Sequence, residues 1–141
     1  MESAASLRMR SAVAAVCFGV LTFAGTAHAP AQGKLPRFAL KSGESAELRN
    51  YFWVVNCQSI LVGNPTAEIL EGPEEVEVAV KPDKILPRAQ NCAKEVPGGH
   101  IIATAKDIKE RKDAKLTIRL KFNTKQGERQ SSDTYIISLF P

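Results

Sequence analysis

Apolar and polar side chains alternate with a period of two along much of the chain beyond residue 36. The clearest case is 116–122, where leucine, isoleucine and phenylalanine alternate with threonine, arginine and lysine. This alternation is typical of a β-strand with one buried face and one face in solvent. The same pattern, or a run of β-branched and aromatic residues, predicts strands at 37–41, 46–55, 66–70, 75–80, 100–105, 116–122 and 134–140.

Turn-forming residues separate these runs. Gly63-Asn64-Pro65, Lys81-Pro82-Asp83 and Pro97-Gly98-Gly99 each predict a turn, because glycine, proline and asparagine favour turn geometries. The segment 125–128 predicts a hairpin connection, and 105–114 is the one stretch that predicts a helical turn or two.

The predicted fold class is all-β. About seven short strands in about 110 residues favour an antiparallel, immunoglobulin-like β-sandwich, with a small β-barrel as the alternative. The strand at 46–55 is apolar on both sides towards its end, which predicts a central place in a sheet. The expected organisation is a flexible lead-in at 30–36 followed by a single domain at 37–141.

Residues 1–29 have the features of a secretory signal peptide. Arg8 and Arg10 precede an apolar stretch at 12–25, and Ala27-His28-Ala29 supplies small residues at the cleavage site. The apolar stretch is shorter than the roughly 20 residues of a membrane-spanning helix. We therefore expect a periplasmic or extracellular protein with no membrane span after cleavage. A retained anchor is one alternative. A lipoprotein signal at Cys17 is the second, although Val16 stands where lipoprotein processing requires a small residue.

Cleavage leaves two cysteines, Cys57 and Cys92, in a chain of net charge about +3. Export to an oxidising compartment predicts that they form a disulfide, which closes a loop of about 36 residues. The chain-entropy model gives such a loop about 3–4 kcal/mol of stabilisation. A pair of buried free thiols is the alternative.

Catalytic and ligand-binding signatures are weak in the mature chain. His100 is its one histidine, which is too few nitrogen ligands for a typical zinc site, and no phosphate loop or nucleophile elbow is present. The glutamates at 68–77 are interpreted as a solvated strand face, although paired carboxylates alone support glycoside hydrolysis. The lysines at 106–115 are mixed with acids and lack aromatic neighbours, which disfavours nucleic-acid binding. We predict no enzymatic activity, no cofactor and no metal.

Two further features are open to two interpretations. A disulfide at Cys92 would make loop 85–92 rigid and present Arg88, Gln90 and Asn91 at fixed positions, as a partner-binding surface does. The same loop is equally understood as a structural crossing of the sandwich. Trp53 is interpreted as a core residue and not as a ligand platform.

The order of several short motifs resembles a group of small exported bacterial proteins with a predicted immunoglobulin-like sandwich. These motifs are Val54-Val55-Asn56-Cys57, Glu71-Gly72-Pro73, Asn91-Cys92, Val96-Pro97-Gly98-Gly99 and Tyr135-Ile136-Ile137-Ser138-Leu139. The resemblance covers 46–141, implies one disulfide and carries over no catalytic residue. The expected function is a protein-binding or envelope structural module. The alternative is a secreted inhibitor or ligand-capture protein that uses loop 85–92.

Overall fold

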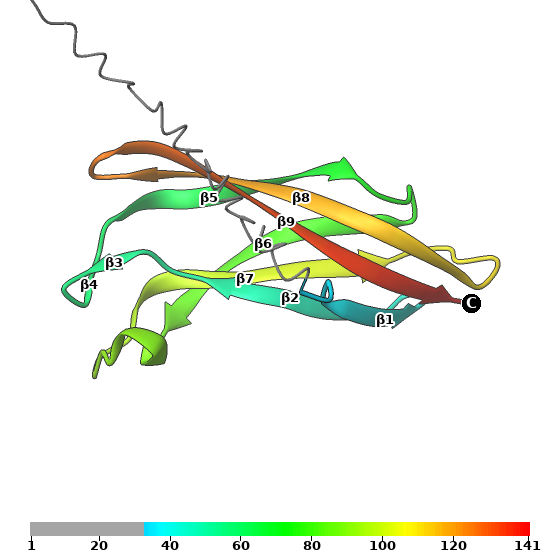
Figure 1. Ribbon diagram of the computed structural model, residues 1–141, viewed down its shortest axis with the longest axis horizontal. Coiled ribbons are helices and arrows are strands. Elements are labelled where there is room, and N and C mark those ends of the chain that lie inside the picture. The colour runs from blue at the N-terminus through cyan, green and yellow to red at the C-terminus, as the bar shows by residue number, and fades with distance from the viewer. Residues whose placement is uncertain (1–32) are drawn as a thin grey trace, which may run out of the picture. The chain divides into compact units, whose positions relative to one another are not determined.

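Two sheets face each other in the computed structural model, which describes residues 33–141 (Figure 1). The predicted signal peptide therefore lies outside the described residues. The four-stranded sheet has the order β1-β9-β8-β5, the three-stranded sheet has the order β2-β7-β6, and a short hairpin pairs β3 with β4. The strands are β1 Arg37–Lys41, β2 Ser45–Tyr51, β3 Val54–Val55, β4 Gln58–Ser59, β5 Leu61–Glu71, β6 Val76–Ile85, β7 Val96–Ala105, β8 Lys112–Thr124 and β9 Gly127–Phe140.

The connectivity is that of an immunoglobulin-like sandwich. In chain order, β2, β7 and β6 stand where the second, fifth and fourth strands of an immunoglobulin domain form one sheet, and β5, β8 and β9 form the other. β1 lies at the edge of the four-stranded sheet, where it pairs in parallel with β9. The remaining strand pairs are antiparallel, and the sheets do not close into a barrel. The predicted sandwich is confirmed.

The core lies between the inner faces of β7, β8 and β9. Every second residue is buried from Ile101 to Ala105 in β7, from Leu116 to Thr124 in β8 and from Tyr135 to Leu139 in β9, so the alternation predicted at 116–122 is confirmed. Burying one such aliphatic side chain stabilises the fold by about 1.5–3 kcal/mol. The side chains with no exposed surface include Ile101, Leu116, Ile118, Leu120, Ile137 and Leu139.

The predicted central position of 46–55 is wrong. β2 is an edge strand, and the central strand of its sheet is β7. The apolar run that suggested a central strand is divided, because the chain leaves the sheet after Tyr51 and forms the β3–β4 hairpin. Tyr51, at the end of β2, belongs to the buried core. Trp53 follows β2 in the chain and packs against this core.

Three predicted turns lie inside strands. Gly63-Asn64-Pro65 is a register shift within β5, and Pro82 lies in the edge strand β6, where a missing N–H is tolerated. Pro97-Gly98-Gly99 lies within β7. Its glycines do not form a turn but allow neighbouring groups to approach the strand closely. A Cβ atom on Gly99 would lie 2.5 Å from the Tyr51 hydroxyl oxygen.

The predicted helical turn at 105–114 is also absent. Residues 106–111 form an irregular connection, in which Asp107 has a φ of 52°. Its Ile108 is buried and donates its N–H to the Ser42 hydroxyl at 3.2 Å. Within residues 33–141, no helix is long and apolar enough to cross a membrane. The predicted hairpin at 125–128 is confirmed, with Gly127 at φ +115° after the two-residue turn.

Candidate functional site

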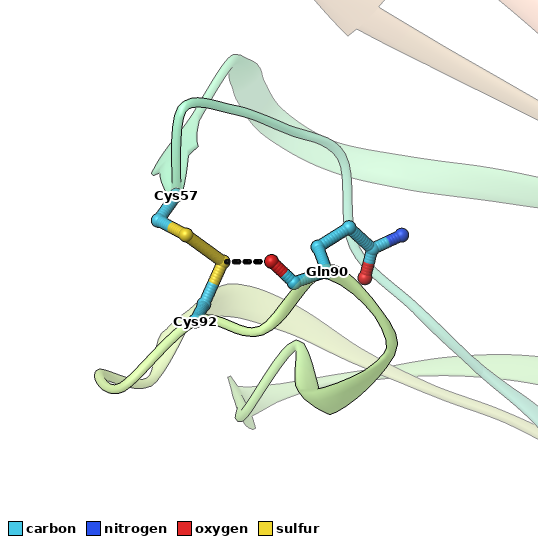
Figure 2. Close-up of a disulfide and its surroundings, with 3 residues drawn as sticks. All are labelled: Cys57, Gln90 and Cys92. Atoms are coloured by element: carbon cyan, nitrogen blue, oxygen red, sulfur yellow. Dashed lines mark hydrogen bonds between the residues drawn. A yellow bond between two sulfur atoms is a disulfide. The ribbon is translucent and has the colours of Figure 1, made fainter.

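The predicted disulfide joins two connections at one end of the sandwich (Figure 2). Cys57 is exposed at the tip of the β3–β4 hairpin, where Asn56 and Cys57 have φ of 50° and 60°. Cys92 is buried in the connection between β6 and β7. The Cα atoms lie 5.4 Å apart, within the usual range for a disulfide. The bridge therefore does not span two facing strands, as the disulfide of an antibody domain does.

The bridged segment, loop 85–92, folds back on itself. Pro87 is buried, residues Arg88–Gln90 form a single 3₁₀ turn, and Asn91 ends it in the left-handed conformation. The Pro87 carbonyl oxygen accepts hydrogen bonds from the N–H groups of both Gln90 and Cys92, each at 3.2 Å. The disulfide and these local hydrogen bonds together fix the loop without a strand or a long helix.

The three predicted binding residues lie together on this loop. Arg88, Gln90 and Asn91 are all exposed. The Cys92 sulfur lies 3.8 Å from the Gln90 carbonyl oxygen (Figure 2), which is a van der Waals contact because an oxidised sulfur carries no proton to donate. Within the described part of the chain, Arg88 makes no ion pair. Its guanidinium is thus available to a partner.

His100 lies between two carboxylates on the outer face of the three-stranded sheet. Its Nδ1 is 3.0 Å from Glu47 Oε2 on β2, and its Nε2 is 3.1 Å from Asp83 Oδ2 on β6. The Asp83 contact has hydrogen-bond geometry, whereas the Glu47 contact has the distance of an ion pair without good alignment. Glu47 first and Asp83 second raise the pKa of His100 above its ordinary value. His100 therefore links the three strands electrostatically and is not paired with a nucleophile.

This arrangement predicts a pH-dependent contribution to stability. Because the pKa of His100 is raised by folding, its stabilisation is complete below the unfolded pKa near 6.5 and is lost as pH rises through the folded pKa. We expect His100→Gln to lower the free energy of unfolding at pH 5.5 by less than about 1 kcal/mol, and by less still at pH 8.5. Urea unfolding of both proteins at the two pH values measures this. A larger loss at pH 8.5 would contradict the assignment.

The acidic run that suggested paired carboxylates is occupied by ion pairs. Glu75 contacts Lys112, Glu77 contacts Lys106, and the other ion-paired carboxylates of the run contact basic residues on β8. The hydrogen bond from Lys112 is the main reason that the pKa of Glu75 is lowered. A lowered pKa makes Glu75 a poor general acid, since a general acid needs a raised pKa. The solvated-face interpretation explains these residues better.

Trp53 packs against the core, as predicted, but it is only half-buried and also lines a surface pocket. Its ring stacks on that of Phe122, with centroids 3.4 Å apart and planes 16° from parallel, and lies 5.8 Å from the Tyr51 ring. This stack covers the end of the core beneath the β8–β9 hairpin.

Sequence reasoning missed three polar residues on the inward side of β9. Arg129, Ser131 and Asp133 pair with Phe122, Leu120 and Ile118, whose side chains are buried. Asp133 forms an ion pair with Arg49 of the opposite sheet at 2.7 Å. A signal was present, because the apolar alternation of 135–139 stops abruptly at 133.

Comparison with known proteins adds no further assignment. No protein-family model matches the chain, and no curated protein or solved structure matches it. The proposals below therefore rest on the geometry of residues 33–141 and on the sequence.

Proposed function

We propose that the protein is exported and acts as a non-enzymatic binding module, which holds a protein or an envelope component through loop 85–92. The observation that carries this proposal is the fixed, exposed presentation of Arg88, Gln90 and Asn91 beside the disulfide. A loop that is already ordered loses little conformational entropy on binding, so its contacts contribute more of their energy to affinity. The disulfide itself fits an oxidising compartment.

The position of the loop supports this role. In Figure 1 the green 3₁₀ turn, the β3–β4 hairpin and the β8–β9 hairpin lie at the same end of the sandwich. Sandwich domains often bind partners through connections clustered at one end, because the sheets hold the loops rigidly. The charges nearby are mixed, which favours a protein surface over a polyanion.

A pair of matched variants tests the proposal. The oxidised protein serves as bait for envelope and secreted extracts of its source organism, followed by titration of the purified partner. We expect Arg88→Ala/Gln90→Ala to weaken binding by 10-fold or more, because it removes a charge and an amide from a rigid surface. Asn91→Gly, which keeps the left-handed backbone, tests the third residue separately.

Lys94→Ala/Glu95→Ala is the control, since both residues are exposed in the same connection but lie beyond the bridge. The control should bind as the unaltered protein does. Equal affinity of the loop variant and the control would show that loop 85–92 is only a structural crossing. Turnover of the captured partner or of a glycan by the purified protein would overturn the non-enzymatic role.

A further inference from the structure

The edge of β9 is covered by β1 along 5 of its 14 residues. β1 pairs with residues Ile136–Phe140, whereas β9 begins at Gly127. On the side of β9 that faces β1, the last backbone hydrogen bond is donated by the Ile136 N–H to the Pro36 carbonyl oxygen at 2.9 Å. Because main-chain groups alternate along a strand, the N–H and C=O groups of Gln130, Ser132 and Thr134 point to this same side. Within residues 33–141 no strand or backbone hydrogen bond meets them.

Three of the edge strands carry features that discourage strand addition, and the fourth, β1, is only 5 residues long. β2 has a register shift between Glu47 and Arg49, β5 has two register shifts, and β6 contains Pro82. Bulges and prolines are common means by which edge strands avoid pairing with another chain. β9 pairs with β8 without a shift along its whole length, and therefore offers a regular edge at 128–134.

A pocket lies beside this open edge. It has a volume of about 350 Å³ and is lined by Trp53, Ile60 and Phe122 together with Arg129, Gln130 and Ser131. The stacked Trp53 and Phe122 rings form an apolar wall. The volume is near the lower end of the range of about 300–1,000 Å³ for ligand pockets. The pocket is thus suited to a single large side chain.

The polar groups at the pocket have unused bonding capacity. The Ser131 hydroxyl oxygen is buried and makes no hydrogen bond in the structure. Arg129 makes no ion pair within residues 33–141, in contrast to Asp133, which is neutralised by Arg49. An unpaired guanidinium beside an apolar pocket favours a partner that carries a carboxylate.

We propose that the open half of β9 binds an extended segment of a partner polypeptide as an added strand, with a large apolar side chain in the pocket and an acidic side chain against Arg129. Strand addition satisfies the free groups of Gln130, Ser132 and Thr134, and the pocket supplies selectivity. β1 already occupies the other half of the same edge in this manner, so an extended chain is the occupant for which the edge is shaped. This proposal is independent of loop 85–92.

The probe is a library of random ten-residue peptides displayed on phage and selected against the oxidised protein. We expect selected peptides to combine a large apolar residue with an acidic one, and a synthetic copy to slow amide exchange at Gln130, Ser132 and Thr134. Arg129→Glu should shift the selected sequences from acidic to basic residues. The variant Arg88→Ala/Gln90→Ala should bind the same peptide unchanged, which separates this site from the loop.

Ser132 provides a matched pair of variants. Ser132→Pro removes one edge N–H but no hydrogen bond to β8, and should weaken the peptide at least 10-fold. Ser132→Ala keeps the N–H and should bind normally. If the proline variant unfolds, amide exchange in the unaltered protein still decides the question.

Four results would overturn the proposal. The first is a library that returns no binder, and the second is a binder that leaves these amides unprotected or binds both Ser132 variants equally. The third is protection of the amides in the free protein at low concentration, which would assign the edge to the chain's own preceding segment. Protection that appears only with dimerisation in the ultracentrifuge would assign the edge to a second copy.

Discussion

Replacing both Cys57 and Cys92 by serine is expected to lower the free energy of unfolding by about 3–4 kcal/mol. The bridge spans a sequence separation of 35 residues, and its removal restores the conformational freedom of that segment to the unfolded chain. Stabilities of domains of this size are typically 5–15 kcal/mol, so the loss is a large fraction of the total. Urea unfolding of the oxidised protein and the double variant measures it.

The structure also predicts which segments are destabilised when the disulfide is removed. Cys57 and Cys92 join two connections and not two core strands, so the sheets should keep their pairing in the variant. Amide exchange should accelerate chiefly in the β3–β4 hairpin and at 86–95. The reduced, alkylated protein is the control and should lose a similar amount. A loss below about 1 kcal/mol would contradict this prediction. It would mean that the two connections are held by packing alone, for example by the buried Pro87.

The strands that follow a simple rule could be predicted from the sequence. In 116–122 each apolar residue faces the core because a sandwich buries one side of every strand, and the period of two therefore reports the fold directly. The edge strand at 37–41 was predicted with its observed bounds. The disulfide could be predicted as well, since removal of the expected signal peptide would leave only two cysteines to pair.

Features that depend on distant neighbours could not be predicted in this way. Pro97-Gly98-Gly99 has the composition of a turn, and only the presence of Tyr51 against the strand shows that the glycines serve close packing. The central place expected for 46–55 failed for a related reason. The apolar residues after Tyr51 leave the sheet, where Trp53 stacks on Phe122 and Val55 is exposed. An apolar run therefore does not by itself identify a strand that is covered on both faces.

The two candidate sites differ in the same respect. Loop 85–92 could be predicted because its rigidity follows from one covalent bond between named residues. The open half of β9 could not be predicted. Whether a strand edge is free depends on where the neighbouring strand ends, and the neighbour here, β1, is far from β9 in the sequence. The polar residues at 129–133 could be seen in the sequence, but only the strand order shows that they lie beside an open sheet edge.

Gly99→Ala is expected to cost about 3 kcal/mol, at the upper end of the range for overpacking a tightly packed site. The new methyl group would contact the Lys81 carbonyl oxygen of β6 on one side and the Tyr51 side chain on the other. Both neighbours belong to the sheet in which β7 is central, so relief requires a movement of backbone and not merely a new rotamer. Chemical denaturation measures the loss.

Gly33→Ala is the matched control, because nothing lies within 4 Å of its added Cβ, and it should change stability by less than about 0.5 kcal/mol. Tyr51→Phe tests which neighbour opposes the new methyl group more strongly, the Tyr51 hydroxyl or the Lys81 carbonyl. If the tyrosine hydroxyl were the main obstacle, Tyr51→Phe would recover most of the stability lost in Gly99→Ala. We expect at most partial recovery, since the Lys81 carbonyl remains. Full recovery, or a loss in Gly99→Ala as small as that of Gly33→Ala, would mean that the glycine at 99 is not required by this close approach.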